Sequence, residues 1–126
     1  MRYAPLVLAP AFAAAAIAGP ALAVDPVKSG AAEFQQRCAA CHSASASDKG
    51  FKAGPNLAGV MGRKAGTFPK FRYSKAMAAT GFQWDAGRLD AFLAAPRKVV
   101  PGTTMPLSVP DAESRRAIVA YLGSRK

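Results

Sequence analysis

The chain has 126 residues, and its 17 Lys and Arg against 7 Asp and Glu give a net charge of +10. This length suits one domain with a thin core, which small proteins often reinforce with a disulfide, a metal or a large cofactor. The basic excess favours acidic partners, whether protein, membrane surface or nucleic acid. The sequence contains no internal repeat, no second domain and no useful run of strand-like alternation, which argues against repeat and sheet-based folds.

Residues 1–23 have the layout of a secretory signal peptide. Arg2 supplies a short positive start, residues 6–18 are apolar and uncharged, and Ala-Leu-Ala at 21–23 is a small-x-small cleavage signal. The rival interpretation is an uncleaved membrane anchor, but the apolar run is shorter than the roughly 20 residues that a spanning helix needs, and prolines interrupt it. We therefore expect cleavage, a periplasmic domain of residues 24–126 without membrane insertion, and no nucleic-acid partner.

Four stretches combine apolar residues at helical spacing with residues suited to helix ends. They are residues 25 to about 41, 73–79, 85–95 and 111–122. Proline 96 is expected to stop the third of them. The intervening segments 43–71 and 99–109 are rich in Gly, Pro or small polar residues, so they are expected to be irregular and to take their shape from what they wrap. These features predict an all-α domain with long loops around a bound group.

The sequence Cys38-Ala39-Ala40-Cys41-His42 is the C-x-x-C-H pattern of c-type haem attachment. Residues three apart lie on one helix face about one turn apart, so both thiols can reach the two vinyl groups of one porphyrin. His42 follows directly and can turn its imidazole onto the iron from the same side. The only two cysteines and the only histidine of the chain fall within these five positions, which makes the signal specific.

Other uses of the cysteine pair fit the sequence poorly. A thioredoxin-like redox motif needs a surrounding βαβ pattern, which is absent. A zinc site needs four ligands, usually with a second cysteine or histidine pair, which the chain cannot supply. A disulfide within one helical turn would remove almost no chain entropy from the unfolded state. The motif therefore indicates covalent haem.

The residues alone leave the second axial ligand of the iron open. A second histidine is excluded, so the candidates are Met61, Met77, Met105, a lysine or an open site. Met105 is favoured because it stands in a loop stiffened by prolines, where Pro106 biases it toward extended backbone. Met61 and Met77 sit among small residues and are more typical of gap-filling core methionines.

Further short motifs follow in a fixed order along the chain. They are Gly30 and Phe34, Gly-Pro-Asn-Leu at 54–57, Gly59, Gly-Arg-Lys at 62–64, Tyr-Ser at 73–74, Trp84, Pro-Gly-Thr-x-Met at 101–105 and Ala-Tyr-Leu at 120–122. With the attachment motif, they resemble class I cytochrome c, especially the mitochondrial cytochrome c and bacterial cytochrome c2 branch. The resemblance implies a small cytochrome c fold in which the N- and C-terminal helices cross and shorter helices and long loops wrap one haem c. It also implies that Met105 is the second axial ligand.

The resemblance assigns roles to four further residues. The Pro55 carbonyl would accept a hydrogen bond from the second ring nitrogen of His42 and fix the ring. Arg63, Tyr73 and Trp84 would bond or face the haem propionates, since buried charge must be paired. Two plainer alternatives remain: Trp84 as ordinary core and Arg63 as a solvated surface charge.

The same resemblance places the crossing of the two terminal helices at Gly30, with Phe34, Ile118 and Tyr121 in contact there. The chain departs from the family at three positions near the site. Phe92 replaces the usual tyrosine near the methionine sulfur, Thr104 stands where a lysine is common, and Leu107 replaces an aromatic residue. These departures leave the reduction potential and the partner choice open.

Histidine and methionine ligands leave no free coordination position, so the resemblance implies a protein that transfers electrons and is not an enzyme. We expect a soluble periplasmic one-electron carrier that acts by outer-sphere transfer through the haem edge. One alternative is a haem c electron-entry subunit of a periplasmic dehydrogenase. A peroxidase and a gas sensor are weaker alternatives, because both need an accessible sixth position on the iron.

Acidic redox proteins are the expected partners of this basic chain, which we expect to be a monomer. A cytochrome bc1 complex, a terminal oxidase, a photosynthetic reaction centre and a dehydrogenase are all compatible with the sequence. Four basic residues match family positions around the haem edge and are the expected docking residues: Arg37, Lys52, Arg97 and Lys98. Charges at the rim of an interface chiefly alter the association rate and its salt dependence.

Overall fold

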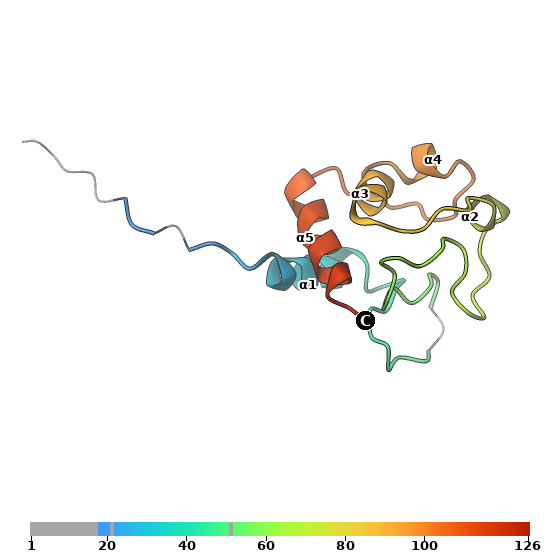
Figure 1. Cartoon of the computed structure of the whole chain (residues 1–126), viewed down its shortest axis with the longest axis horizontal. Coiled ribbons are helices and arrows are strands. Elements are labelled where there is room, and N and C mark those ends of the chain that lie inside the picture. Colours follow the sequence, from blue (N-terminus) through green and yellow to red (C-terminus); the bar gives the residue numbers. More distant parts are fainter. Residues whose placement is uncertain (1–17, 21, 51) are drawn as a thin grey trace, which may run out of the picture.

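The computed structural model describes residues 18–20, 22–50 and 52–126 (Figure 1). It contains five helices: α1 (Pro26–Arg37), α2 (Lys75–Ala78), α3 (Ala86–Ala94), α4 (Pro96–Val99) and α5 (Ala112–Gly123). In this part of the chain there is no strand, only an isolated bridge between Lys64 and Gln83. The predicted all-α class with long loops is confirmed.

Most of the predicted signal peptide lies outside the described residues, and none of the described helices has the length and apolar character to cross a membrane.

Helix α1 begins as predicted and ends earlier. The Asp25 side chain accepts a hydrogen bond from the backbone N–H of Val27, and a proline occupies the first position of the helix. The helix stops at Arg37 because the Phe34 carbonyl accepts from two successive amides, those of Cys38 at 2.8 Å and Ala39 at 2.9 Å. The attachment motif therefore follows the helix instead of forming its last turn.

The attachment motif makes a tight turn of its own after α1. The Cys38 carbonyl accepts hydrogen bonds from the backbone N–H groups of Cys41 at 3.0 Å and His42 at 2.8 Å. This turn keeps the two cysteines about one turn apart, as the sequence predicted, and places His42 directly after them.

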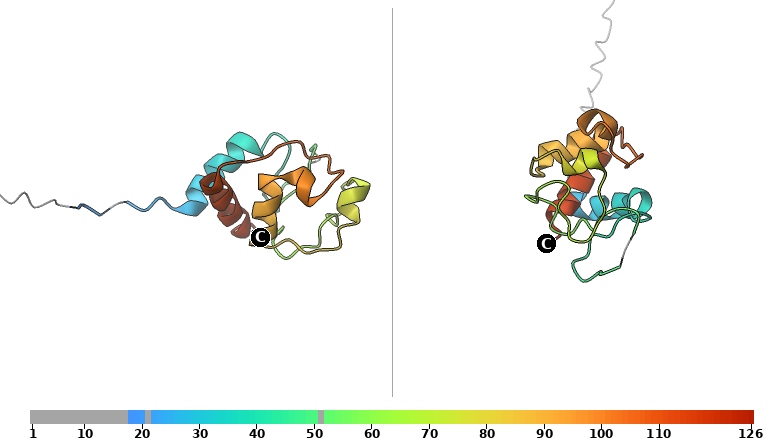
Figure 2. Two further views of the ribbon diagram at one scale, coloured as in Figure 1. Left: turned by 90° about the horizontal axis from the view of Figure 1, so that it is seen from above. Right: turned by 90° about the vertical axis from the view of Figure 1, so that its right-hand side faces the viewer.

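Helices α1 and α5 cross at Gly30, as the resemblance implied. A Cβ atom at Gly30 would overlap the backbone carbonyl of Ala117, so only glycine allows this approach. Beside the crossing, the rings of Phe34 and Tyr121 pack with centroids 5.4 Å apart, and Ile118 is completely buried. Figure 2 shows the two helices lying across one another in both views.

The shorter helices differ from prediction at their ends. Helices α2 and α3 are capped by the side chains of Ser74 and Asp85 and are a few residues shorter than expected. Pro96 does not simply stop a helix: it occupies the first position of α4, a short helix that the sequence did not predict. Helix α5, predicted over residues 111–122, is capped by the Asp111 side chain and ends one residue later than predicted, at Gly123.

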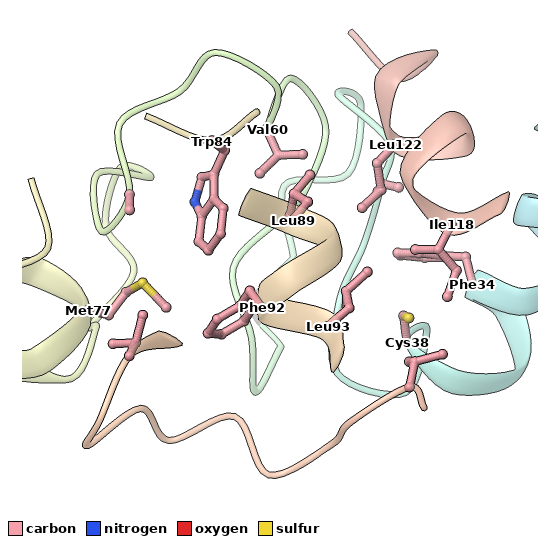
Figure 3. Packing of buried hydrophobic residues seen from close by; sticks show 14 residues of the cluster. Phe34, Cys38, Val60, Met77, Trp84, Leu89, Phe92, Leu93, Ile118 and Leu122 are labelled. Carbon is pink, nitrogen blue, oxygen red and sulfur yellow. The ribbon is translucent and has the colours of Figure 1, made fainter. Parts of the chain in front are cut away.

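The buried residues gather in the space that the helices and the two long loops surround. Figure 3 shows Leu89, Phe92 and Leu93 projecting from α3 toward side chains of α1, α5 and the long loops. Trp84 stands beside them and packs edge-on against Phe92, with ring centroids 5.2 Å apart. The core therefore lines an interior region and does not form a continuous layer between two helices.

Candidate haem-binding site

An apolar cavity of about 350 Å³ lies in this interior region. Its wall comes from the attachment turn, both long loops, α3 and α5. All the site residues expected from the sequence lie on this wall: Cys38, Cys41, His42, Pro55, Arg63, Tyr73, Trp84 and Met105. Residues far apart in the sequence thus meet around one space with an apolar lining, as a large flat apolar cofactor requires.

The His42 ring is held in one orientation. Its Nδ1 atom lies 2.7 Å from the Pro55 carbonyl oxygen, so Nδ1–H donates and the lone pair of Nε2 stays available to a metal. Burial of the ring lowers the pKa of His42 more than the Pro55 hydrogen bond raises it. The imidazole is therefore neutral at pH 7, which is the state that binds iron.

Gly54 sets the distance between the His42 ring and the loop that holds it. A Cβ atom at this position would overlap the imidazole, and the backbone N–H of Gly54 donates to the Cys41 carbonyl at 2.8 Å. The sequence placed Gly54 in a family motif but gave it no role. Its close approach to the ring could be found only in three dimensions.

The two cysteines on the cavity wall differ in their exposure to solvent. Cys38 is buried and Cys41 is exposed. Burial raises the pKa of the Cys38 thiol. Both lie on the cavity wall beside His42, so two thioether bonds to one porphyrin are compatible with their placement.

Two of the three methionines considered as the second axial ligand line the cavity. Met61 packs against the core and is not on the cavity wall, whereas Met77 and Met105 both are. Met105 stands in the loop between α4 and α5, where its backbone N–H donates to the Thr103 hydroxyl at 3.3 Å. Thr103 is itself buried and donates its N–H to the Val100 carbonyl at 3.0 Å. A local turn therefore holds the Met105 backbone.

Arg63 is half-buried and is not a free surface charge. Its guanidinium donates to the carbonyls of Asn56 at 2.9 Å and Ala58 at 3.1 Å and stacks over the Phe68 ring. Within the described residues no acidic side chain pairs with it. A half-buried cation without an acidic partner, on the wall of an apolar cavity, fits a cofactor that brings its own carboxylates.

Tyr73 and Trp84 flank the same cavity. The Tyr73 hydroxyl accepts a hydrogen bond from the backbone N–H of Phe68 at 3.1 Å, and burial raises the pKa of this phenol. Trp84 is 8% exposed and packs between Phe82 and Phe92. This packing suits the ordinary core role of Trp84 as well as a role toward the propionates.

The departures from the family pattern also lie on the cavity wall. Phe92, Thr104 and Leu107 line it, and Leu107 is 39% exposed at its edge. The buried Phe92 side chain carries no polar group, so this part of the wall is apolar where the family usually has a hydroxyl.

Two of the four expected docking residues are already engaged within the chain. Arg37 pairs with Glu33 at 2.6 Å on α1, and the Lys52 ammonium donates to the Ala39 carbonyl at 2.9 Å. Arg97 and Lys98 are exposed on α4. Lys52 thus ties its loop to the attachment turn, a contact that the sequence did not indicate.

Comparisons with known proteins agree with this site. The family model described as cytochrome c matches residues 27–126. Cytochrome c2 iso-2 of Magnetospirillum fulvum is 43% identical over 88 residues, which cover 69% of this chain and 90% of that protein. "Cytochrome c-type cyt cy" of Rhodobacter capsulatus is 37% identical over 106 residues, or 83% of this chain; the chain spans about half the length of that relative, 52%.

A solved structure shares the fold as well as the sequence. Cytochrome cH from Methylobacterium extorquens superposes with a TM-score of 0.71 at 35% identity, covering 79% of this chain and 98% of that one. The expected small cytochrome c fold, the covalent haem and the non-enzymatic role are confirmed. The chain belongs to the cytochrome c family and is an electron carrier with one covalent haem c, not an enzyme.

Proposed function

We propose that this cytochrome c is a periplasmic shuttle that carries single electrons between redox protein complexes. When bound, the haem supplies an iron that changes valence by one electron. Cys38 and Cys41 would attach it through two thioether bonds, and His42 and Met105 would supply the nitrogen and the sulfur that bind its iron. The observation that carries the proposal is that all these residues line one apolar cavity, with the His42 ring already fixed by Pro55.

Met105 is the better of the two methionines on the cavity wall. Met77 lies on α2, is 9% exposed and belongs to the buried core cluster. Packing in the core is therefore a sufficient role for this side chain. Met105 is only partly buried, packs against the edge of that cluster from the loop between α4 and α5, and has its backbone oriented by Thr103. Binding by both His42 and Met105 would leave the iron no free position for a substrate and would raise its reduction potential, which favours a carrier over a peroxidase or a gas sensor.

Arg63 and Tyr73 support the polar edge of the haem in this proposal. The Arg63 guanidinium would pair with a propionate while keeping its hydrogen bonds to the loop carbonyls. The apolar wall formed by Trp84 and Phe92 would keep water away from the iron. Exclusion of water limits the reorganisation that accompanies each change of charge.

The predicted signal peptide and the basic charge of the chain support the proposed location and partners. An acidic docking face on a bc1 complex, a terminal oxidase, a photosynthetic reaction centre or a dehydrogenase would attract the positive field. All four expected docking residues are exposed, but Arg37 and Lys52 already have partners in the chain, so Arg97 and Lys98 are the strongest docking candidates. Permanent association with a dehydrogenase is the alternative, and size exclusion of the native extract separates it from a free shuttle.

The ligand assignment is tested by the near-infrared absorption band that a methionine sulfur gives with ferric haem iron. We expect the wild-type ferric protein to show this band, Met105→Ala to lose it and Met77→Ala to keep it. Loss of the band in Met77→Ala with retention in Met105→Ala would overturn the assignment. A high-spin ferric spectrum in the wild type would overturn the closed site altogether.

A further inference from the structure

Arg115, in the first turns of α5, joins three parts of the chain outside the cavity. Its Nε atom lies 2.8 Å from the Asp90 carboxylate on α3. Its Nη1 atom donates to the carbonyls of Val109 at 3.0 Å and Pro110 at 2.6 Å, at the end of the loop that carries Met105. The Arg115 side chain is 14% exposed.

This ion pair differs from the others in the described part of the chain. The pairs Arg37–Glu33 and Arg88–Asp85 each lie along or at the end of a single helix, within four residues. Arg115 and Asp90 are 25 residues apart and connect α5 to α3. The neighbouring Arg116 is exposed and provides an internal comparison with the same charge.

The loop end that Arg115 holds lies close to Met105. Val109 is only four residues further along the chain, is completely buried, and donates its N–H to the Leu93 carbonyl on α3 at 2.8 Å. On the N-terminal side of Met105, the Thr103 hydroxyl accepts a hydrogen bond from the backbone N–H of Met105. The methionine therefore stands between two anchors, a local turn before it and the contacts of Val109 and Pro110 after it.

We propose that Arg115, supported by Asp90, is a positioning residue that holds the Met105 loop against α3 and so keeps the methionine sulfur on the iron. This inference rests on the proposed role of Met105 as axial ligand. Hydrogen bonds from a charged donor are stronger than neutral ones, and removing the donor leaves the part-buried Val109 carbonyl without this partner and the exposed Pro110 carbonyl to water. Without these bonds the loop after Met105 is held less firmly against α3, so the methionine sulfur should leave the iron more readily.

The test is the affinity of the ferric holoprotein for added imidazole, which must displace the methionine. We expect Arg115→Ala and Asp90→Ala to bind imidazole about tenfold more tightly than the wild type, which corresponds to the loss of roughly one charge-assisted hydrogen bond. Asp90→Asn keeps an acceptor for Arg115, so it should restore most of the wild-type behaviour. Because Asp90 is nearly half exposed, its variants test the idea even where Arg115→Ala folds poorly.

Two variants separate this role from general stability. Arg116→Ala removes the same charge from the same helix and should leave imidazole affinity unchanged. Arg125→Ala breaks the bond from Arg125 to the Ala44 carbonyl, far from Met105 in sequence, and should reduce stability without changing imidazole affinity. Wild-type affinity in Arg115→Ala and Asp90→Ala, or an equal rise in Arg125→Ala, would overturn the inference. Absence of the methionine band in the wild type would instead overturn the proposed function.

Discussion

Gly54 lies so close to the His42 ring that no side chain fits between them. We therefore expect Gly54→Ala to push the imidazole or the loop aside and to lower the free energy of unfolding by about 1–3 kcal/mol, the usual cost of overpacking a filled site. Denaturant unfolding of the ferric holoprotein measures this change.

Gly87→Ala is the matched control for this substitution. A Cβ atom at Gly87 would meet only the Asp85 carboxylate at 3.5 Å, an ordinary contact, in the first turn of α3. Alanine favours a helix over glycine, so this variant should be as stable as the wild type or more stable. Equal stability of Gly54→Ala and the wild type would show that the ring does not depend on this close approach.

His42 also predicts how stability changes with pH. Burial lowers its pKa in the folded protein below the ordinary 6.5, and iron ligation acts in the same direction because only the neutral ring binds the metal. As the pH falls below about 6.5, His42 becomes protonated in the unfolded state but stays neutral in the folded state. The free energy of unfolding therefore decreases. Denaturant unfolding at a series of pH values should show this decrease.

The pH range in which His42 changes the stability differs from that of the aspartates with lowered pKa values. Asp48 and Asp111 also have lowered pKa values, mainly because each accepts a backbone hydrogen bond, but their ordinary value is 3.8. Their contributions are present above this value and are lost only as the pH falls further. Stability that stays constant from neutral pH down to about 4 would contradict a buried, ligated His42.

The residues that line the cavity as a candidate site could be picked out from the sequence because most of them belong to compact motifs. Cys38, Cys41 and His42 form one signal by spacing alone, and the family resemblance supplied the positions that now line the cavity with them. The roles of Gly54, Lys52 and Arg115 could not be predicted in this way. Each depends on contacts with backbone groups at other places in the chain, which residue type and spacing do not reveal.

At the level of helices, the crossing of α1 and α5 depends on Gly30. Alanine there would overlap the Ala117 carbonyl and force the two helices apart. We expect Gly30→Ala to reduce amide hydrogen-exchange protection in α1 and α5 more than in α3, because only the first two meet at this point. An equal loss of protection in all three helices would show that the crossing is not a separate unit of stability.

Helix positions were predicted well and helix ends less well. Asp25, Asp85 and Asp111 cap α1, α3 and α5 through their side chains, and such signals are local and readable. The early end of α1 depends on one carbonyl shared by two amides, and α4 depends on Pro96 starting a new helix after a change in backbone direction. Local residue preferences allow both outcomes at these places, and tertiary packing decides between them.

At the level of the whole molecule, the net charge of +10, or +9 once cleavage of the predicted signal peptide removes Arg2, predicts a strong salt dependence of electron transfer. The rate of reaction with an acidic partner should fall steeply as ionic strength rises, because salt screens the long-range attraction. At low salt, Arg97→Ala and Lys98→Ala should each slow the reaction by about two- to tenfold. Stopped-flow measurement over a range of salt concentrations checks both expectations.

Lys28→Ala is the control for these docking variants. Lys28 is exposed in the first turn of α1, a helix that does not contact α4. Its loss removes one positive charge and should affect the rate less than loss of Arg97 or Lys98. A rate that is independent of salt, or equal effects of all three variants, would contradict a docking face at α4.

The central claim, an iron closed on both sides by His42 and Met105, is tested most directly by adding carbon monoxide to the ferrous protein. A closed site cannot take the gas without losing a ligand, so the visible spectrum of the wild type should stay unchanged in excess carbon monoxide. Met105→Ala, in the same experiment, should bind it and change its spectrum. Ready binding by the wild type would contradict the account and would indicate an open iron, as in a gas sensor or a peroxidase.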